Sequence, residues 1–271
     1  MKKIFSDEQI KYILENYQNK SYSEIGNALG FTERQVRGKI NGMGLRKLKT
    51  FNSSYFHSID TPHKAYWLGF IYADGCIISS KENRNYELTI EVDENDSYIL
   101  DELNKELTGN HEIKIRNREI KFNGYTYTSH TARIRVYSKE VVSDLINNGI
   151  VSNKTNSEVY PHCTNYVRDF VRGFLDGDGC ISIKDDCHGF PSYALLSFVN
   201  SNSDFLSYLN ELIIEEVRAS GKIYKEKDKK YKLYYCGQDS IGSILKWLYD
   251  DADLFLIRKY KKYQLVSGLA A

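Results

Sequence analysis

Two aspartates, Asp74 and Asp178, occupy the same place in two closely matching stretches of the chain. Residues 69–77 and 173–181 share Gly, Phe, Asp, Gly, Cys and Ile, which is six of nine positions. Chance rarely produces such a match, so we interpret the stretches as two copies of one unit. If the copies meet, their two like charges can coexist only with a proton or a cation between them.

Each copy is predicted to be an apolar helix that stops at a glycine, Gly75 or Gly179. Glycine suits the left-handed conformation just past a helix end, and we expect that conformation at both positions. The preceding aspartate stands where the helix already presents about half a negative charge, which disfavours a carboxylate. An unfavourable charge in both copies indicates a function, and Asp-Gly turns after core helices are the structural alternative.

Small residues lie one turn apart on each predicted helix, Gly69 with Ala73 and Gly173 with Gly177. Without bulky side chains at these positions, the two helices can approach until their backbones nearly touch. That packing would bring the two aspartates side by side. A divalent metal ion is the simplest occupant of the space between them.

The two stretches resemble the paired motif of the LAGLIDADG homing endonucleases, in the form that carries both motifs in one chain. The resemblance covers roughly residues 51 to 267. It implies an α+β fold of two pseudo-symmetric αββαββα repeats, with the motif helices paired at the interface and two antiparallel sheets facing DNA. It also implies a site-specific endonuclease, monomeric because both motifs share one chain, that cuts both strands of duplex DNA at a long asymmetric site.

In this family the last aspartate of each motif is a metal ligand, helped by the main-chain carbonyl before it. The resemblance therefore makes Asp74 with the Ala73 carbonyl, and Asp178 with the Gly177 carbonyl, the catalytic metal ligands. Mg²⁺ is the expected ion because it prefers hard oxygen ligands and keeps its waters, and Mn²⁺ is an alternative. Metal ions so held can activate water, neutralise the phosphoryl charge and stabilise the leaving 3′ oxygen.

Tyr72 occupies the earlier acidic position of the first motif, where the second motif has Asp176. We do not interpret this as inactivation, because the metal-binding position is the later one. Family members also place a basic or polar residue near each scissile phosphate. The candidates here, each of which is alternatively a phosphate contact or a surface charge, are Lys139, Lys154, Gln238 and Lys259.

The N-terminal segment 6–45 is predicted to form three short helices, each with a capping box. The boxes are Ser6 with Gln9, Ser21 with Glu24, and Thr32 with Gln35. A short turn between the second and third helices gives a helix-turn-helix arrangement. The third helix carries side chains suited to major-groove reading and phosphate contact, namely Arg34, Gln35, Arg37 and Lys39. The alternative is a solvated face of a small structural bundle.

The expected domain organisation follows from these motifs. It comprises a helix-turn-helix domain over 1–46, a linker over 47–62, a first repeat over 63–150, an inter-repeat linker over 151–165 and a second repeat over 166–271. In the first repeat we expect strands over 76–80 and 87–92 and helices over 95–107 and 139–148. In the second we expect strands over 181–183 and 194–199, a basic hairpin, and helices over 203–219, 241–249 and 254–265.

The later strands of the first repeat are predicted to have one apolar and one cationic face. Their expected core residues are Ile113, Ile115, Ile120, Ile134 and Val136, and their DNA-binding residues are Lys114, Arg116, Arg118, Arg133 and Arg135. The second repeat offers Lys184, Lys222, Lys225, Lys227, Lys229 and Lys232. A cationic sheet face suits a phosphate backbone. An ordinary charged sheet edge is the alternative for the Lys-rich hairpin alone.

The chain has 271 residues and a formal net charge of only +1, so the distribution of charge matters more than its sum. It contains no apolar run near 18 residues and no charged-then-apolar N-terminus, and we expect a cytoplasmic protein with no membrane partner. The frequent Tyr, Lys, Asn and Ile suggest a bacterial or phage origin. The five cysteines show no C-x-x-C spacing, so neither zinc nor a disulfide framework is expected.

Three alternative functions stay open at this level. A non-cleaving DNA-binding regulator would gain nothing from the two aspartates. An intron-splicing RNA maturase on the same scaffold is disfavoured by the helix-turn-helix, because the deep RNA major groove does not admit a helix. An intein is disfavoured because the chain opens with Met1 and closes with Ala271, without the Cys or Ser start and His-Asn end of protein splicing.

Overall fold

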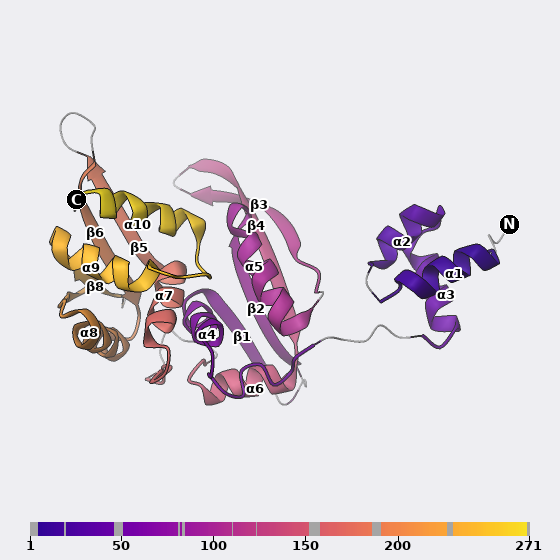
Figure 1. The fold of residues 1–271 in the computed structure, drawn as a ribbon, viewed down its shortest axis with the longest axis horizontal. Helices are drawn as coiled ribbons and strands as arrows, with labels where there is room; N and C mark the ends of the chain where they lie inside the picture. The colour runs from indigo at the N-terminus through magenta and orange to yellow at the C-terminus, as the bar shows by residue number, and fades with distance from the viewer. Residues whose placement is uncertain are drawn as a thin grey trace. The chain divides into compact units, whose positions relative to one another are not determined.

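The computed structural model contains two compact units, Met1–Thr50 and Phe51–Ala271. It describes residues 5–18, 20–45, 51–80, 82, 85–109, 111–122, 124–151, 158–185, 191–226 and 230–269. Each unit has its own hydrophobic core, and Figure 1 labels the elements of both. Within the described ranges, no helix has both the length and the apolar character needed to span a bilayer.

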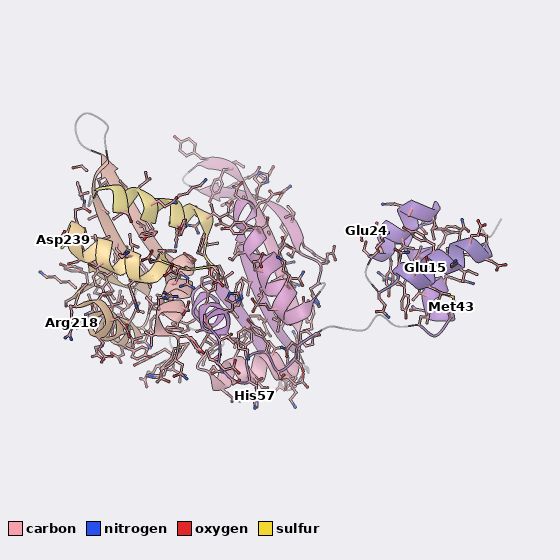
Figure 2. All side chains as sticks on the ribbon, viewed as in Figure 1. Glu15, Glu24, Met43, His57, Arg218 and Asp239 are labelled. Atoms are coloured by element: carbon pink, nitrogen blue, oxygen red, sulfur yellow. The ribbon has the colours of Figure 1, made fainter. Side chains whose placement is uncertain are left out.

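The first unit is built from three helices, α1 (Asp7–Asn16), α2 (Tyr22–Leu29) and α3 (Glu33–Gly42). All three predicted capping boxes are confirmed, since each N-cap hydroxyl and each Gln or Glu three residues later satisfy one another's backbone amides. The buried faces of the helices supply the core, which consists of Ile13, Ile25, Phe31, Val36 and Ile40. Met43, which follows α3 and is labelled in Figure 2, packs against this core.

The turn between α2 and α3 depends on two glycines. Gly30 caps α2 with a φ of 71°, which is the left-handed conformation that glycine adopts at little cost. A Cβ atom on Gly26 would lie 2.6 Å from the Phe31 carbonyl oxygen, so the chain after the turn passes directly over α2. The predicted close succession of the second and third helices is therefore present.

The first half of the second unit begins with α4 (Pro62–Asp74), β1 (Gly75–Ser80) and β2 (Asn85–Asp93). One helix was expected over 95–107, but the structure has three pieces, a 3₁₀ turn (Glu94–Asp96), α5 (Tyr98–Leu103) and a π-helical turn η2 (Asn104–Thr108). The half ends with β3 (Lys114–Phe122), β4 (Tyr125–Tyr137) and α6 (Lys139–Asn147). Its strands form an antiparallel sheet in the order β1-β2-β4-β3.

The second half runs through α7 (Val167–Asp178), β5 (Gly179–Asp185), β6 (Pro191–Asn200) and α8 (Ser203–Val217). It continues with β7 (Lys222–Lys225), β8 (Tyr231–Tyr235), α9 (Gln238–Tyr249) and α10 (Ile257–Leu269). The sheet order β5-β6-β8-β7 has the same pattern as the first sheet. The unit is a mixed α+β structure with two four-stranded antiparallel sheets.

Helices α4 and α7 lie side by side between the two sheets (Figure 1). A Cβ atom on Gly69 would lie 2.1 Å from the Phe170 carbonyl oxygen, and one on Gly173 would lie 2.0 Å from the Tyr66 carbonyl oxygen. The predicted backbone contact is therefore confirmed, because neither position has room for any side chain. The apolar side chains of both helices are buried in the shared core of the unit.

The expected left-handed conformation at the two helix ends is wrong. Gly75 has φ −74° and ψ 147°, and Gly179 has φ −81° and ψ 161°, so both are extended and begin their strands directly. Glycine is required for a different reason, since a Cβ atom would lie 2.6 Å from the carbonyl oxygen of Ile71 or Leu175, one turn back in the helix. The sharp change from helix to strand leaves no room for a methyl group.

The predicted alternation of faces is confirmed in β4 and only partly in β3. Ala132, Ile134 and Val136 are buried, and the residues between them point to the outer face. In β3, Ile120 falls on the same face as the basic residues, and Ile115 is 50% exposed. β3 is an edge strand, so less of the core reaches it than the sequence pattern implied.

Candidate catalytic centre and nucleic-acid interface

Asp74 and Asp178 are the last residues of α4 and α7, and both are exposed although the helices before them are buried. The helices touch at this end, since a Cβ atom on Gly177 would lie 2.3 Å from the Ala73 Cβ. The same position lies 3.4 Å from the Asp74 Oδ2. The Asp74 carboxylate is thus placed against the residue that precedes Asp178, at the junction of the two halves.

This pair of carboxylates fits a hard cation that keeps much of its water. In the described part of the chain, no group of three or more His, Cys, Asp and Glu side chains is arranged to hold a metal ion. Mg²⁺ is usually bound by one or two carboxylates together with water and substrate phosphate, without a complete protein cage. The donor set of the helix pair therefore suits that ion when a phosphodiester is present.

Asp176, the earlier acid of the second motif, is fully buried and has a structural role. Its carboxylate accepts hydrogen bonds from the Tyr66 hydroxyl at 2.8 Å, the Tyr249 hydroxyl at 2.7 Å and the Leu256 amide at 2.8 Å. Burial raises the pKa of Asp176, although these donors and nearby Lys259 oppose the rise. Through these hydrogen bonds Asp176 links α7 to α4, to α9 and to the segment before α10.

Tyr72, at the matching position of the first motif, is 3% exposed and packs against the rings of Phe174 and Phe205. Burial raises the pKa of its hydroxyl, which also makes a hydrogen bond with Asn200. The ring fills apolar space in the second half. The first motif thus has a tyrosine in place of the acid at a buried packing position, two residues before the exposed Asp74.

Lys259 is 3% exposed and lies under the end of α7. Its ammonium donates to the carbonyl oxygens of Asp176 at 2.9 Å and Gly179 at 2.7 Å, and also to that of Leu175. Burial lowers the pKa of Lys259 to about 8, and Asp176 counters part of this effect. A cation at a helix C-terminus offsets the negative end of the dipole, where Asp178 adds a further negative charge. Sequence reasoning proposed Lys259 as an auxiliary residue but missed its bonds to the helix end.

The other auxiliary candidates lie in different surroundings. Lys139 is the first residue of α6 and lines a surface hollow with Ser53 and His57, the latter labelled in Figure 2. The Gln238 amide donates to the Ser192 carbonyl oxygen at 3.1 Å. Lys154 is outside the described residues.

Arg258 was missed at the sequence level and lies beside the Asp74 carboxylate. The two line one hollow of about 350 Å³, to which Asp96 and Thr131 also contribute. The Arg258 Nε donates to the Asp96 Oδ2 at 2.7 Å. Burial lowers the pKa of Arg258, but the charges of Asp96, Asp176 and Asp74 raise it by more. The available sequence signal was its place directly before Lys259.

The five predicted cations of the first repeat share the outer face of the first sheet, since Lys114 pairs with Arg133 and Arg116 with Thr131 in the strand register. Sequence reasoning missed two glutamates of β2 on the same face. Glu91 accepts from Arg116 at 3.2 Å, from Arg118, and from the Thr131 hydroxyl at 2.7 Å. Glu87 is 3.0 Å from the Arg135 Nε. The face is therefore less cationic than expected.

The lysines of the second repeat are divided between the two faces of their sheet. Strand register places Lys222 and Lys232 with Lys184 on the outer face, opposite the buried Ile181 and Leu233. Lys225 is on the other face, with its ammonium 6.0 Å from the centre of the Tyr231 ring. Lys227 and Lys229 lie outside the described residues.

In the first unit, the candidate residues of α3 are only partly available. Arg34 is exposed, whereas the Gln35 side-chain oxygen accepts from the Thr32 amide at 2.9 Å in the capping box. Arg37 is paired with Glu33 and stacks over the Tyr22 ring at 5.5 Å. Lys39 is half-buried.

Comparison with protein-family models gives no match, and neither does comparison with curated proteins. Among solved structures, the chain is similar to meganuclease I-SmaMI bound to uncleavable DNA with a TTGT central four, at a TM-score of 0.52 and 16% identity over 76% of this chain and 87% of that chain. A variant of I-SmaMI gives a TM-score of 0.51 and 16% identity over 75% and 88%. A variant of I-DmoI in complex with its nicked target DNA gives a TM-score of 0.46 and 18% identity over 74% of this chain and 99% of that chain. The similarity to I-SmaMI shows a shared fold.

Proposed function

We propose that this chain is a LAGLIDADG-type homing endonuclease, a metal-dependent enzyme that cuts both strands of duplex DNA at a long asymmetric site. The observation that carries the proposal is the pair of exposed aspartates at the touching ends of α4 and α7. An apolar helix pair has no structural use for two like charges at its junction, and a pure binding protein would gain nothing from them. The fold shared with I-SmaMI supports the proposal.

In the proposed site, Asp74 and Asp178 would hold Mg²⁺ or Mn²⁺, together with the carbonyl oxygens of Ala73 and Gly177. Bound metal would supply an activated water and neutralise charge on the phosphoryl group and the leaving oxygen. Lys259 holds the end of α7 in place through its three carbonyl contacts and so orients Asp178. Arg258 adds positive charge beside Asp74, where it favours an approaching phosphodiester.

We further propose that residues 63–150 and 166–271 are pseudo-symmetric repeats, each reading one half of the target with the outer face of its sheet. The equal strand orders of the two sheets support this. The faces differ in their side chains, with arginines on the first and lysines on the second, so the two half-sites should differ in sequence. Because both motifs lie in one chain, a monomer would contain the complete site.

For residues 1–46 we propose a helix-turn-helix module that adds contacts with DNA. The three capped helices and the exposed Arg34 on α3 support this role. The third helix of such modules commonly enters the major groove. Removal of the module should weaken binding of the full target while the cleavage chemistry of the remaining chain persists.

The test is selection of cleaved sites from a long randomised duplex library in Mg²⁺, with a parallel selection for binding in Ca²⁺. A protein carrying Asp178→Asn is the matched background, because the proposed substitution removes one metal ligand and leaves both outer sheet faces intact. Cut ends that share one long asymmetric sequence are the expected result. Enrichment in the binding arm alone would replace the proposal with a non-cleaving DNA-binding regulator, and enrichment in neither arm would overturn DNA as the substrate.

A further inference from the structure

The five cations on the outer face of the first sheet are not equivalent, because four of them form an ion pair with a carboxylate. Arg116 and Arg118 share Glu91, Arg135 is 3.0 Å from Glu87, and the Lys114 ammonium is 3.7 Å from Glu112. Arg133 is the exception in the described part of the chain. It makes no ion pair there, and its Nε is buried without a hydrogen-bond partner.

Arg133 is also surrounded by like charges. Burial lowers the pKa of its guanidinium, and repulsion from Arg116 and Arg135 lowers it further, while Glu91 acts in the opposite direction. Glu91 lies directly across the strand pair from Arg133, but its carboxylate oxygens accept hydrogen bonds from Arg116, Arg118 and Thr131. An acceptor-rich group placed on Arg133 would thus relieve a repulsion that Glu91 offsets only in part.

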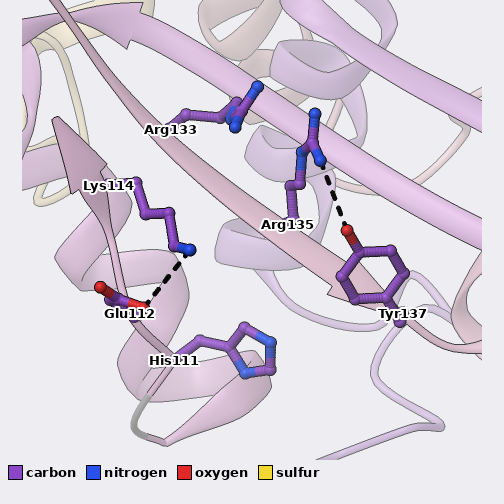
Figure 3. A pocket seen from close by; sticks show the side chains of 6 residues that line it. All are labelled: His111, Glu112, Lys114, Arg133, Arg135 and Tyr137. Carbon is purple, nitrogen blue, oxygen red and sulfur yellow. Dashed lines mark hydrogen bonds and ion pairs between the residues drawn. The ribbon is translucent and has the colours of Figure 1, made fainter. Parts of the chain in front are cut away.

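A hollow of about 380 Å³ lies at this position and gives such a group access. Arg133 and Arg135 project into it from β4 beside Tyr137, and Lys114 and His111 line the side formed by the chain at β3 (Figure 3). Figure 3 draws a contact for Arg135, with Tyr137 at 3.5 Å, and one for Lys114, with Glu112, but none for Arg133. The free guanidinium is therefore presented at an open, cationic recess of the proposed DNA-binding face.

We propose that Arg133 is the principal specificity-determining residue of the first sheet and that it reads one guanine in the major groove. Guanine presents O6 and N7 as two adjacent acceptors there, and arginine is the side chain that most often binds both. The paired arginines Arg116, Arg118 and Arg135 then serve mainly to attract the phosphate backbone, since binding a base would require them to leave their glutamates. This inference rests on the proposed function and concerns how its substrate is recognised.

The experiment measures binding of the full chain in Ca²⁺ to its selected duplex and to duplexes in which each guanine of one half-site is replaced singly. The parent should discriminate against replacement of one guanine by roughly 5- to 150-fold, the range for a good bidentate contact. Arg133→Gln should abolish that preference, and the matched variant Arg118→Gln, from the glutamate-held group, should keep it. Thermal unfolding of both variants establishes that each is folded.

Three results would overturn the inference while leaving the proposed function intact. The first is an unchanged guanine preference in Arg133→Gln, and the second is a selected half-site that contains no discriminated guanine. The third is a uniform loss of affinity for all duplexes in Arg133→Gln together with a salt slope reduced by about 1, which is the behaviour of a phosphate contact. A parent protein that binds no duplex would instead contradict the proposed function itself.

Discussion

Replacement of Gly173 by alanine would insert a methyl group into the tightest contact of the α4–α7 pair. The new Cβ would lie 2.0 Å from the Tyr66 carbonyl oxygen, whereas real Cβ contacts essentially never fall below 3.0 Å, so the helices must separate by at least 1.0 Å at this point. The opposing atoms belong to the backbone of Tyr66 and Phe70 and cannot rotate away. Overpacking costs 1–3 kcal/mol and occasionally more, and this site should reach about 3 kcal/mol.

That energy predicts two measurable losses. In a unit of this size, 1 kcal/mol shifts the unfolding midpoint by roughly 2–4 °C, so Gly173→Ala should unfold about 6–12 °C below the parent. A displacement near 1 Å at catalytic groups can cost on the order of 100-fold in rate, and cleavage should fall by about that factor.

Circular dichroism during heating and cleavage of the selected duplex in Mg²⁺ provide the two assays. Gly242→Ala is the matched control, because Gly242 lies within helix α9 and a Cβ there has nothing within 4 Å. Alanine in an open helical position stabilises by roughly 0.5–1 kcal/mol relative to glycine, so the control should unfold at or above the parent temperature. A Gly173→Ala protein that unfolds and cuts like the parent would refute the account of the helix interface.

The remaining predictions concern a histidine and three cysteines. Burial lowers the pKa of His63, but hydrogen bonds with Glu106 and Asp253 raise it by more, to above 6.5. Its stabilising contribution is therefore full below about pH 6.5 and disappears as the pH rises through the folded value. His63→Gln should lower the unfolding temperature at about pH 5.5 and have little effect at about pH 9. An equal fall in unfolding temperature at both pH values would contradict the stabilising role of protonated His63. Cys76 and Cys180 are exposed next to the aspartate junction, whereas Cys163 is buried and burial raises its pKa to about 11. A thiol reagent should therefore modify Cys76 and Cys180 quickly and Cys163 slowly. Bound duplex should slow the modification of Cys76 and Cys180. Equal modification rates at all three cysteines would refute this placement.

The parts of the fold that depend on local chemistry were predictable from the sequence. The capping boxes at Ser6, Ser21 and Thr32 use residues three positions apart, and they form as predicted. The small residues Gly69 and Gly173 indicated the contact of α4 with α7, because only a backbone approach needs them. The conformation of Gly75 was not predictable, since a glycine after a helix suits both a left-handed cap and a direct passage into a strand.

The parts of the candidate site that depend on strand register and distant contacts were not predictable. Glu91 is separated from Arg116 and Arg118 by 25 and 27 residues and meets them only through the pairing of three strands. Lys259 reaches the end of α7 across more than 80 residues. The charged residues of the interface could be identified from the sequence, but the strand register determines which arginines are paired with glutamates.

The most direct test of the central claim compares strand cleavage by the parent, Asp74→Asn and Asp178→Asn on the selected duplex, with Asp101→Asn as the control. Asp101 is an exposed acid of α5, away from the helix junction in sequence and charge-matched to the test positions. We predict that Asp74→Asn and Asp178→Asn each lose cleavage in Mg²⁺ while they still bind the duplex in Ca²⁺, and that Asp101→Asn cuts like the parent. Full cleavage by either Asp74→Asn or Asp178→Asn would contradict the claim that the paired aspartates form the metal centre.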